Sequence, residues 1–63
     1  MKLLQKAQAL LAGEITVETF RNLAILAKQA TGQEHDYIAD LWEAAYAAAS
    51  EDVLRQAYDE ELL

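Results

Sequence analysis

Hydrophobic residues recur every three to four positions along nearly the whole chain, which is the spacing of helices that bury one face. The pattern is interrupted near Gly13, Gly32 and Ser50. It predicts an all-α fold in a single domain, residues 1–63, built as a small antiparallel bundle of three to four short helices. We expect these helices at about residues 2–12, 17–30, 34–49 and 51–61.

The two glycines, Gly13 and Gly32, are expected to end the first two helices. Gly13 is expected to adopt the left-handed conformation that suits a helix C-cap. The start of the third helix is left open, because two N-caps compete for it. Thr31 has capping-box spacing to Glu34, and Asp36 is the rival cap.

Ser50 is the predicted N-cap of the fourth helix, with Glu51 and Asp52 well placed against the positive end of its dipole. The alternative is one long helix over about residues 34–61 that bends at Ser50. We favour the break. A Glu51–Arg55 pair, four residues apart, is expected to add a few tenths of a kcal/mol to the fourth helix.

Each predicted helix has one apolar face for the core, with Leu26 at the edge of the stripe in the second helix. The alanines of the third helix would let a neighbouring helix approach closely. The expected core residues are Leu3, Leu4, Ala7, Leu10 and Leu11; Val17, Phe20, Leu23, Ala24, Ala27 and Ala30; Tyr37, Ile38, Leu41, Ala44, Ala45 and Ala48; and Val53, Leu54, Ala57 and Tyr58.

The length of 63 residues is close to the lower limit for a domain that folds unaided, because a core this small supplies roughly 3–5 kcal/mol. Disulfides, a metal or oligomerisation often support such domains. The chain has no cysteine, which excludes disulfides and thiolate zinc sites, and its single histidine excludes a multi-histidine site within one chain. We therefore expect a homodimer, with no metal and no cofactor.

Charge divides the chain into two unlike halves. Residues 1–32 carry four basic and two acidic side chains, a net charge of +2, whereas residues 33–63 carry nine acidic side chains and one basic, a net charge of −8. This balance disfavours binding to nucleic acid or to an anionic membrane, and it favours a basic protein partner. Lys2 and Lys6 either face solvent or meet the acidic C-terminal stretch, residues 59–61.

No apolar run approaches the roughly 20 residues of a membrane span. The N-terminus has only the outline of a signal peptide, because Gln5, Lys6 and Gln8 interrupt its apolar region. We expect a complete, soluble gene product that stays in the cytoplasm.

Four residues form a candidate interface for self-association. Ile25 lies among polar residues of the second helix, and Trp42, Tyr46 and Ala49 share one flank of the third. Aromatic side chains with a polar end suit partly wet interfaces. In the alternative, other helices of the same chain cover the aromatic flank, and Ile25 is a single exposed isoleucine of the ordinary kind.

Asp36, Asp40 and Glu43 share one face of the third helix, because they lie four and three residues apart. We regard them as a candidate face for a basic partner. The alternatives are a solvated face and a weak divalent-cation site, although such sites usually draw ligands from several elements.

Enzymatic activity is not expected, because the chain carries no phosphate-binding glycine loop or catalytic motif and is too short to enclose a pocket readily. His35 is expected at the surface, without a nucleophile beside it. The second and third helices around Gly32 have roughly the spacing of a helix-turn-helix. Its recognition helix would present Asp36 and Asp40 to DNA, which is repulsive.

These observations name no pathway. They favour a non-enzymatic, acidic protein–protein interaction module, a homodimeric accessory or regulatory protein that binds and modulates another protein. Compact acidic helical chains without cysteine are common among phage and plasmid accessory proteins, so an inhibitor of that type is one form of this hypothesis. The alternatives are an acidic mimic of nucleic acid in a basic groove of a nuclease or regulator, and a small helix-turn-helix DNA-binding regulator.

Overall fold

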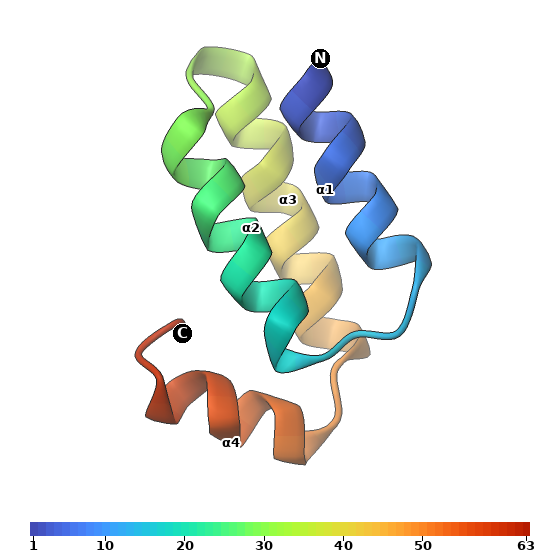
Figure 1. The fold of residues 1–63 in the computed structure, drawn as a ribbon, viewed down its shortest axis with the longest axis vertical. Helices are drawn as coiled ribbons and strands as arrows, with labels where there is room; N and C mark the ends of the chain where they lie inside the picture. The colour runs from blue at the N-terminus through green and yellow to red at the C-terminus, as the bar shows by residue number, and fades with distance from the viewer.

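The computed structural model describes all 63 residues as four helices without a strand (Figure 1). The helices are α1 (Lys2–Ala12), α2 (Val17–Gln29), α3 (Gly32–Ala48) and α4 (Glu51–Asp59). In Figure 1, α1, α2 and α3 lie side by side, with α2 antiparallel to the other two, and α4 runs across the end of the bundle where α3 stops. This arrangement confirms the predicted all-α bundle.

The glycines act differently from the prediction. Gly13 follows α1 in an extended conformation (φ −96°, ψ −163°), so the left-handed cap predicted there is wrong. Gly32 does not end α2, which stops at Gln29. Instead, Gly32 opens α3 with φ +58°, and glycine adopts this left-handed conformation without the steric cost of a Cβ atom. The helix pair therefore needs glycine at this single position.

The helical path is broken at Ser50, between α3 and α4. This confirms the predicted break and excludes one continuous helix. The hydroxyl oxygen of Ser50 accepts a hydrogen bond from the Val53 N–H at 3.3 Å, and Ala49 has an extended backbone (ψ 148°). This N-cap satisfies a backbone donor that would otherwise lack a partner. The break lets α4 turn across the bundle end and pack against α2.

The core has residues of all four helices, with Phe20, Leu23 and Ile38 as its largest fully buried side chains. Leu26, predicted at the edge, is buried. The prediction of four other core positions is wrong, because they are exposed: Tyr37, Ala44, Ala48 and Tyr58. The remaining buried hydrophobic residues are Ala7, Leu26, Ala30, Ala45 and Ala57.

The three errors in α3, at Tyr37, Ala44 and Ala48, have one physical cause. The helix turns Ile38, Trp42 and Ala45 toward the bundle, which is a rotation away from the predicted face through Tyr37 and Ala44. The alanines of α3 lie on several sides of the helix, so its apolar pattern does not define a single buried side. The packing of its large side chains decides the orientation.

Glu34 provides the N-terminal cap of α1 rather than a capping box for its own helix. Its carboxylate Oε2 accepts hydrogen bonds from the backbone N–H groups of Leu3 at 3.1 Å and Leu4 at 3.2 Å. The N-cap position of α3 is occupied by Thr31, without a side-chain cap, and the rival cap Asp36 lies within the helix. A carboxylate here also interacts favourably with the positive end of the α1 dipole.

The C-terminus turns back onto the core through a Schellman motif. Leu62 N–H donates to the Ala57 carbonyl at 2.9 Å, and Glu61 N–H donates to the Tyr58 carbonyl at 3.0 Å. Glu61 has φ +61°, the left-handed conformation that usually requires glycine. The turn brings Leu62 and Leu63 against the core, where they are half-buried.

Glu34→Ala is expected to lower the free energy of unfolding by about 1 kcal/mol, because two N–H groups of α1 lose their acceptor. Urea unfolding followed by circular dichroism measures this change. Glu43→Ala is the matched control, since Glu43 also lies in α3 and its side chain makes no ion pair. Equal losses in the two variants would contradict the capping role.

Glu61→Gly is expected to raise the free energy of unfolding by about 0.5–1 kcal/mol, because glycine adopts the left-handed conformation without steric cost. The comparison variant is Glu61→Ala, which removes the same charge and keeps the Cβ atom. Thermal unfolding of both separates the two effects. A similar gain in both variants would attribute the gain to charge.

Candidate functional site

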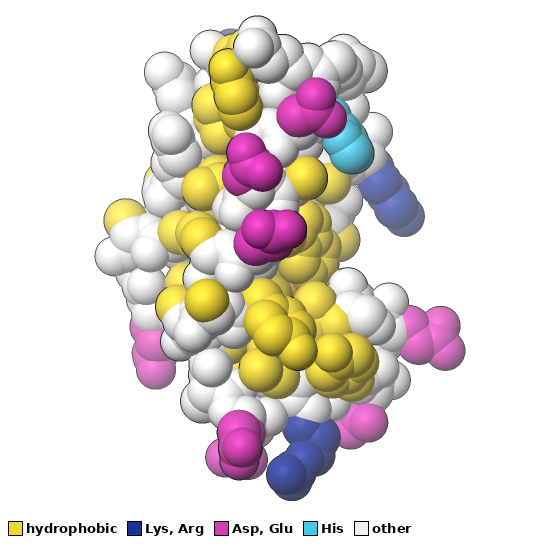
Figure 2. Space-filling view, turned by 180° about the vertical axis from the view of Figure 1, so that it is seen from behind, with side chains coloured by type: hydrophobic (Ala, Val, Ile, Leu, Met, Phe, Trp, Pro, Cys, Tyr) yellow, Lys and Arg dark blue, Asp and Glu magenta, His cyan; other side chains and the backbone are white.

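The predicted acidic face lies on the outer side of α3, where Asp36, Asp40 and Glu43 are all exposed. Figure 2 shows acidic side chains in a row on this face of the molecule. None of the three takes part in an ion pair, because both ion pairs of the protein are made by Arg21. The structure therefore presents three carboxylates in a row without an ion-pair partner.

The acidic face does not assemble a metal site. No group of three or more histidine, cysteine, aspartate or glutamate side chains in the structure is placed to hold a metal ion. Asp36 and Glu43 are seven residues apart, so the face extends over about 10.5 Å of the helix axis. Carboxylates spread along a helix in this way suit a linear array of positive charges better than one cation.

Trp42, the centre of the predicted aromatic flank, packs within its own chain. Its ring lies 5.3 Å from the ring of Phe20, centroid to centroid, with the planes tilted by 31°. Trp42 and Ala49 are half-buried against the core, whereas Tyr46 is 44% exposed. The half-buried ring therefore contacts α2 of the same chain, and a role of this flank in self-association stays a prediction.

Tyr46 of α3 and Tyr58 of α4 form an exposed aromatic pair. Their hydroxyl groups lie 3.2 Å apart and share a hydrogen bond, which raises the pKa of Tyr58 above its ordinary value. Figure 2 shows hydrophobic side chains gathered on the lower part of this face, toward α4. The spacing of Tyr58 predicts a core position, and sequence reasoning therefore misses this pair.

A groove of about 210 Å³ runs between α1 and α2. Leu10 and Leu26 contribute to its apolar lining, together with Ile25, and Lys6 and Asn22 add polar atoms. Ile25 is 54% exposed, as its position among polar residues indicated. The structure does not unite it with Tyr46, which contacts α4 instead. Sequence reasoning missed the groove, because a groove depends on how two helices pack.

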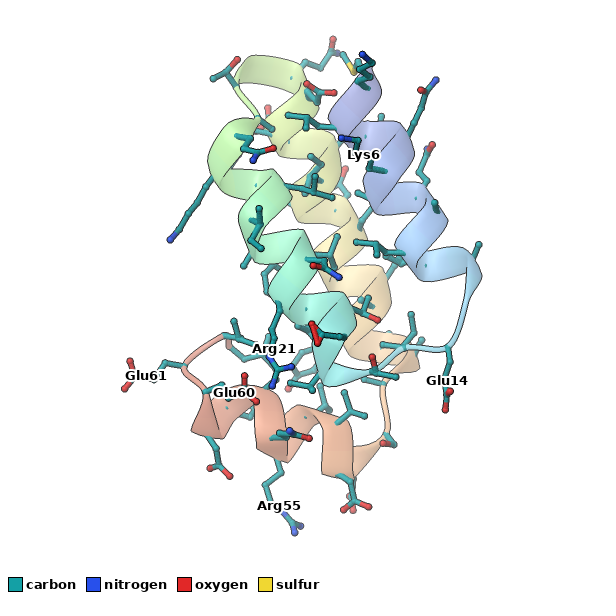
Figure 3. All side chains as sticks on the ribbon, viewed as in Figure 1. Lys6, Glu14, Arg21, Arg55, Glu60 and Glu61 are labelled. Atoms are coloured by element: carbon teal, nitrogen blue, oxygen red, sulfur yellow. The ribbon has the colours of Figure 1, made fainter.

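Arg21 holds α4 against α2 (Figure 3). Its Nε and Nη2 donate to the two carboxylate oxygens of Glu60 at 2.8 and 2.7 Å, and its Nη1 donates to Glu18 at 2.8 Å. Hydrogen bonding to Arg21 lowers the pKa of Glu60, and the hydrogen bonds to Glu60 and Glu18 raise the pKa of Arg21. The bidentate geometry makes this a stronger contact than an ordinary surface pair.

The basic residue that meets the acidic C-terminus is Arg21, so the alternative in which Lys2 and Lys6 meet it is wrong. Both lysines are exposed, as the solvent-facing alternative expected. Figure 3 shows Lys6 and Glu60 at opposite ends of the bundle. The expected Glu51–Arg55 pair is not formed either, since Arg21 makes both ion pairs. Favourable helical spacing did not ensure contact between two exposed, flexible side chains.

Comparison with known protein families, with curated proteins and with solved structures finds no match, so no relative assigns a role to these surfaces. No helix combines the length and the apolar character that a bilayer crossing demands. The candidate site thus consists of three surfaces: the acidic face of α3, the Tyr46–Tyr58 pair and the α1–α2 groove.

Glu60→Gln tests the Arg21 contact through its pH dependence. Because the pKa of Glu60 is lowered in the folded protein, the contact adds stability above about pH 4.3 and loses it as pH falls through the lowered pKa. The variant is expected to be less stable than the wild type at about pH 7, and this difference should shrink below about pH 4.

Urea unfolding at a series of pH values measures the difference in stability. Glu14→Gln is the control, because Glu14 is exposed and its side chain makes no ion pair. A stability difference for Glu60→Gln that stays constant into the acid range would rule out a charged contact.

Proposed function

We propose that this protein is a non-enzymatic, cytoplasmic and dimeric interaction module that binds a basic protein and modulates it. The acidic face, defined as Asp36, Asp40 and Glu43, is the surface for this partner. The observation that supports the proposal is the absence of any ion pair at these three exposed carboxylates, on a helix that has no lysine or arginine.

The surroundings of the acidic face favour a helix as the bound element. Ala39, Ala44 and Ala47 are exposed on α3, interspersed with the carboxylates. Small side chains allow a partner backbone to come close, while the carboxylates attract lysine or arginine side chains spaced three to four residues apart. Opposite charge also accelerates encounter and disfavours partners of the same charge.

The charge density supports a protein partner over mimicry of nucleic acid. The acidic face carries three charges over about 10.5 Å of helix, whereas duplex DNA carries one charge per about 1.7 Å, or about six over the same length. A basic groove shaped for DNA would therefore meet only about half of the negative charge that DNA carries over this length. Direct DNA binding is disfavoured further, because α2 and α3 lie side by side rather than crossed as in a helix-turn-helix (Figure 1).

Partner capture from the native host with an immobilised protein tests the proposal. The variant Asp36→Asn/Asp40→Asn/Glu43→Gln is expected to retain at least about tenfold less of the partner, because three attractive charges are removed. Raising the salt from about 50 mM to about 500 mM should release the partner from the wild type, because exposed charges are screened.

The matched control is Glu14→Gln/Asp59→Asn/Glu61→Gln. It changes the net charge by the same amount at exposed positions outside α3 and is expected to retain the partner. Equal loss in both triple variants would show a general effect of net charge. Capture that is insensitive to both salt and the α3 substitutions would remove the acidic face from the proposal.

A further inference from the structure

Ile25 and the α1–α2 groove form a complementary pair of features on one face. Of the large exposed hydrophobic side chains, Ile25 is the one branched aliphatic; the others are Met1 and three tyrosines. The groove of about 210 Å³ beside it is lined by Leu10 and Leu26. A projecting aliphatic side chain next to an apolar groove suits an isologous contact, in which each copy inserts its own side chain into the other.

The charges of α2 match the same symmetry. Glu18 and Lys28 lie five residues before and after Leu23, and the midpoint between Asn22 and Ile25 is half a residue from Leu23. A two-fold axis at that point makes the two α2 helices antiparallel and places Glu18 opposite Lys28 of the second copy, with an offset of about 1.5 Å along the helix. Both side chains are exposed. Glu18 also pairs with Arg21 of its own chain at 2.8 Å, so a second basic group would approach the same carboxylate.

Net charge favours this face over the others for self-association. The α1 and α2 half of the chain, residues 1–32, has a net charge of +2, whereas residues 33–63 have a net charge of −8. Two copies that met through their acidic halves would repel each other. Figure 1 looks onto the broad face of the molecule, which measures 31 × 22 Å and shows α1 and α2 above α4. Contact over most of this face is needed to reach the roughly 800 Å² that each partner buries in a standard interface.

We propose that the α1–α2 groove is the interface with a second copy of this chain, with Ile25 of each copy seated in the groove of the other. The inference rests on the dimeric state named in the proposed function and is independent of the acidic face. Lys6, which reaches from α1 toward the neighbouring helices in Figure 3, lies at the edge of the contact. Trp42 then serves the core of each copy rather than the interface.

Light scattering after size exclusion, over a dilution series of the purified chain, measures the state of association. The wild type is expected to be a dimer at low micromolar concentration. Ile25→Glu is expected to raise the dissociation constant by at least about 100-fold, because two charges enter an apolar contact. Circular dichroism should show unchanged helicity, since Ile25 is 54% exposed in the single chain. Tyr37→Glu, which adds the same charge at an exposed site on α3, should stay dimeric.

A charge exchange tests the orientation of the two helices. Lys28→Glu is expected to weaken the dimer by about three- to tenfold. Each of the two symmetric Glu18–Lys28 contacts would then place one glutamate against another. Adding Glu18→Lys should restore the affinity to within about twofold. Failure of the second substitution to restore the dimer would overturn the antiparallel arrangement.

The outcomes separate the two proposals. A monomeric wild type at about 100 µM would overturn both the groove interface and the dimeric part of the proposed function. A dimer that survives Ile25→Glu would overturn the groove interface alone. A mass that rises beyond the dimer with concentration would indicate head-to-tail association of unlike faces and would also overturn the two-fold contact. Loss of partner capture in the α3 variant, with an intact dimer, leaves this inference unaffected.

Discussion

Phe20 and Trp42 meet between α2 and α3, and this contact determines which way α3 faces. The alanines of α3 offer little to distinguish one side from another, so the position of the large indole decides the rotation of the helix. With Trp42 turned toward Phe20, Ile38 and Ala45 enter the core. Asp36, Asp40 and Glu43 are then directed outward together. The sequence placed them on one side of the helix, and the packing of Trp42 exposes that side as a single acidic face.

The ends of the chain depend on polar contacts because the hydrophobic core is small. Glu34 binds two N–H groups at the start of α1, and Arg21 binds the carboxylate of Glu60 after α4. Each contact joins elements that are distant in the sequence. The Schellman turn at Glu61 adds a third device, since it returns Leu62 and Leu63 to the core. Charged residues thus complete a fold whose apolar surface alone is modest.

The two proposed surfaces differ in charge, because the acidic residues are concentrated in the second half of the chain, and they therefore suit different partners. The acidic α3 face is suited to a basic helix and unsuited to a second copy of itself, because like charges would be opposed. The α1–α2 face has the opposite character, with an exposed isoleucine, an apolar groove and charges that match under a two-fold axis. In the proposed arrangement, one chain of 63 residues would associate with itself and still present its carboxylates to another protein.

Local interactions determined what the sequence alone predicts: four helices, the break at Ser50, the exposure of Ile25 and the shared face of the three acids. These follow from periodicity and from caps that involve neighbouring residues. Only the tertiary structure decided the cap from Glu34, the Arg21–Glu60 contact, the Tyr46–Tyr58 pair and the α1–α2 groove. The physical reason is that each joins residues from different helices, whose relative rotation is decided by packing that one-dimensional periodicity does not contain.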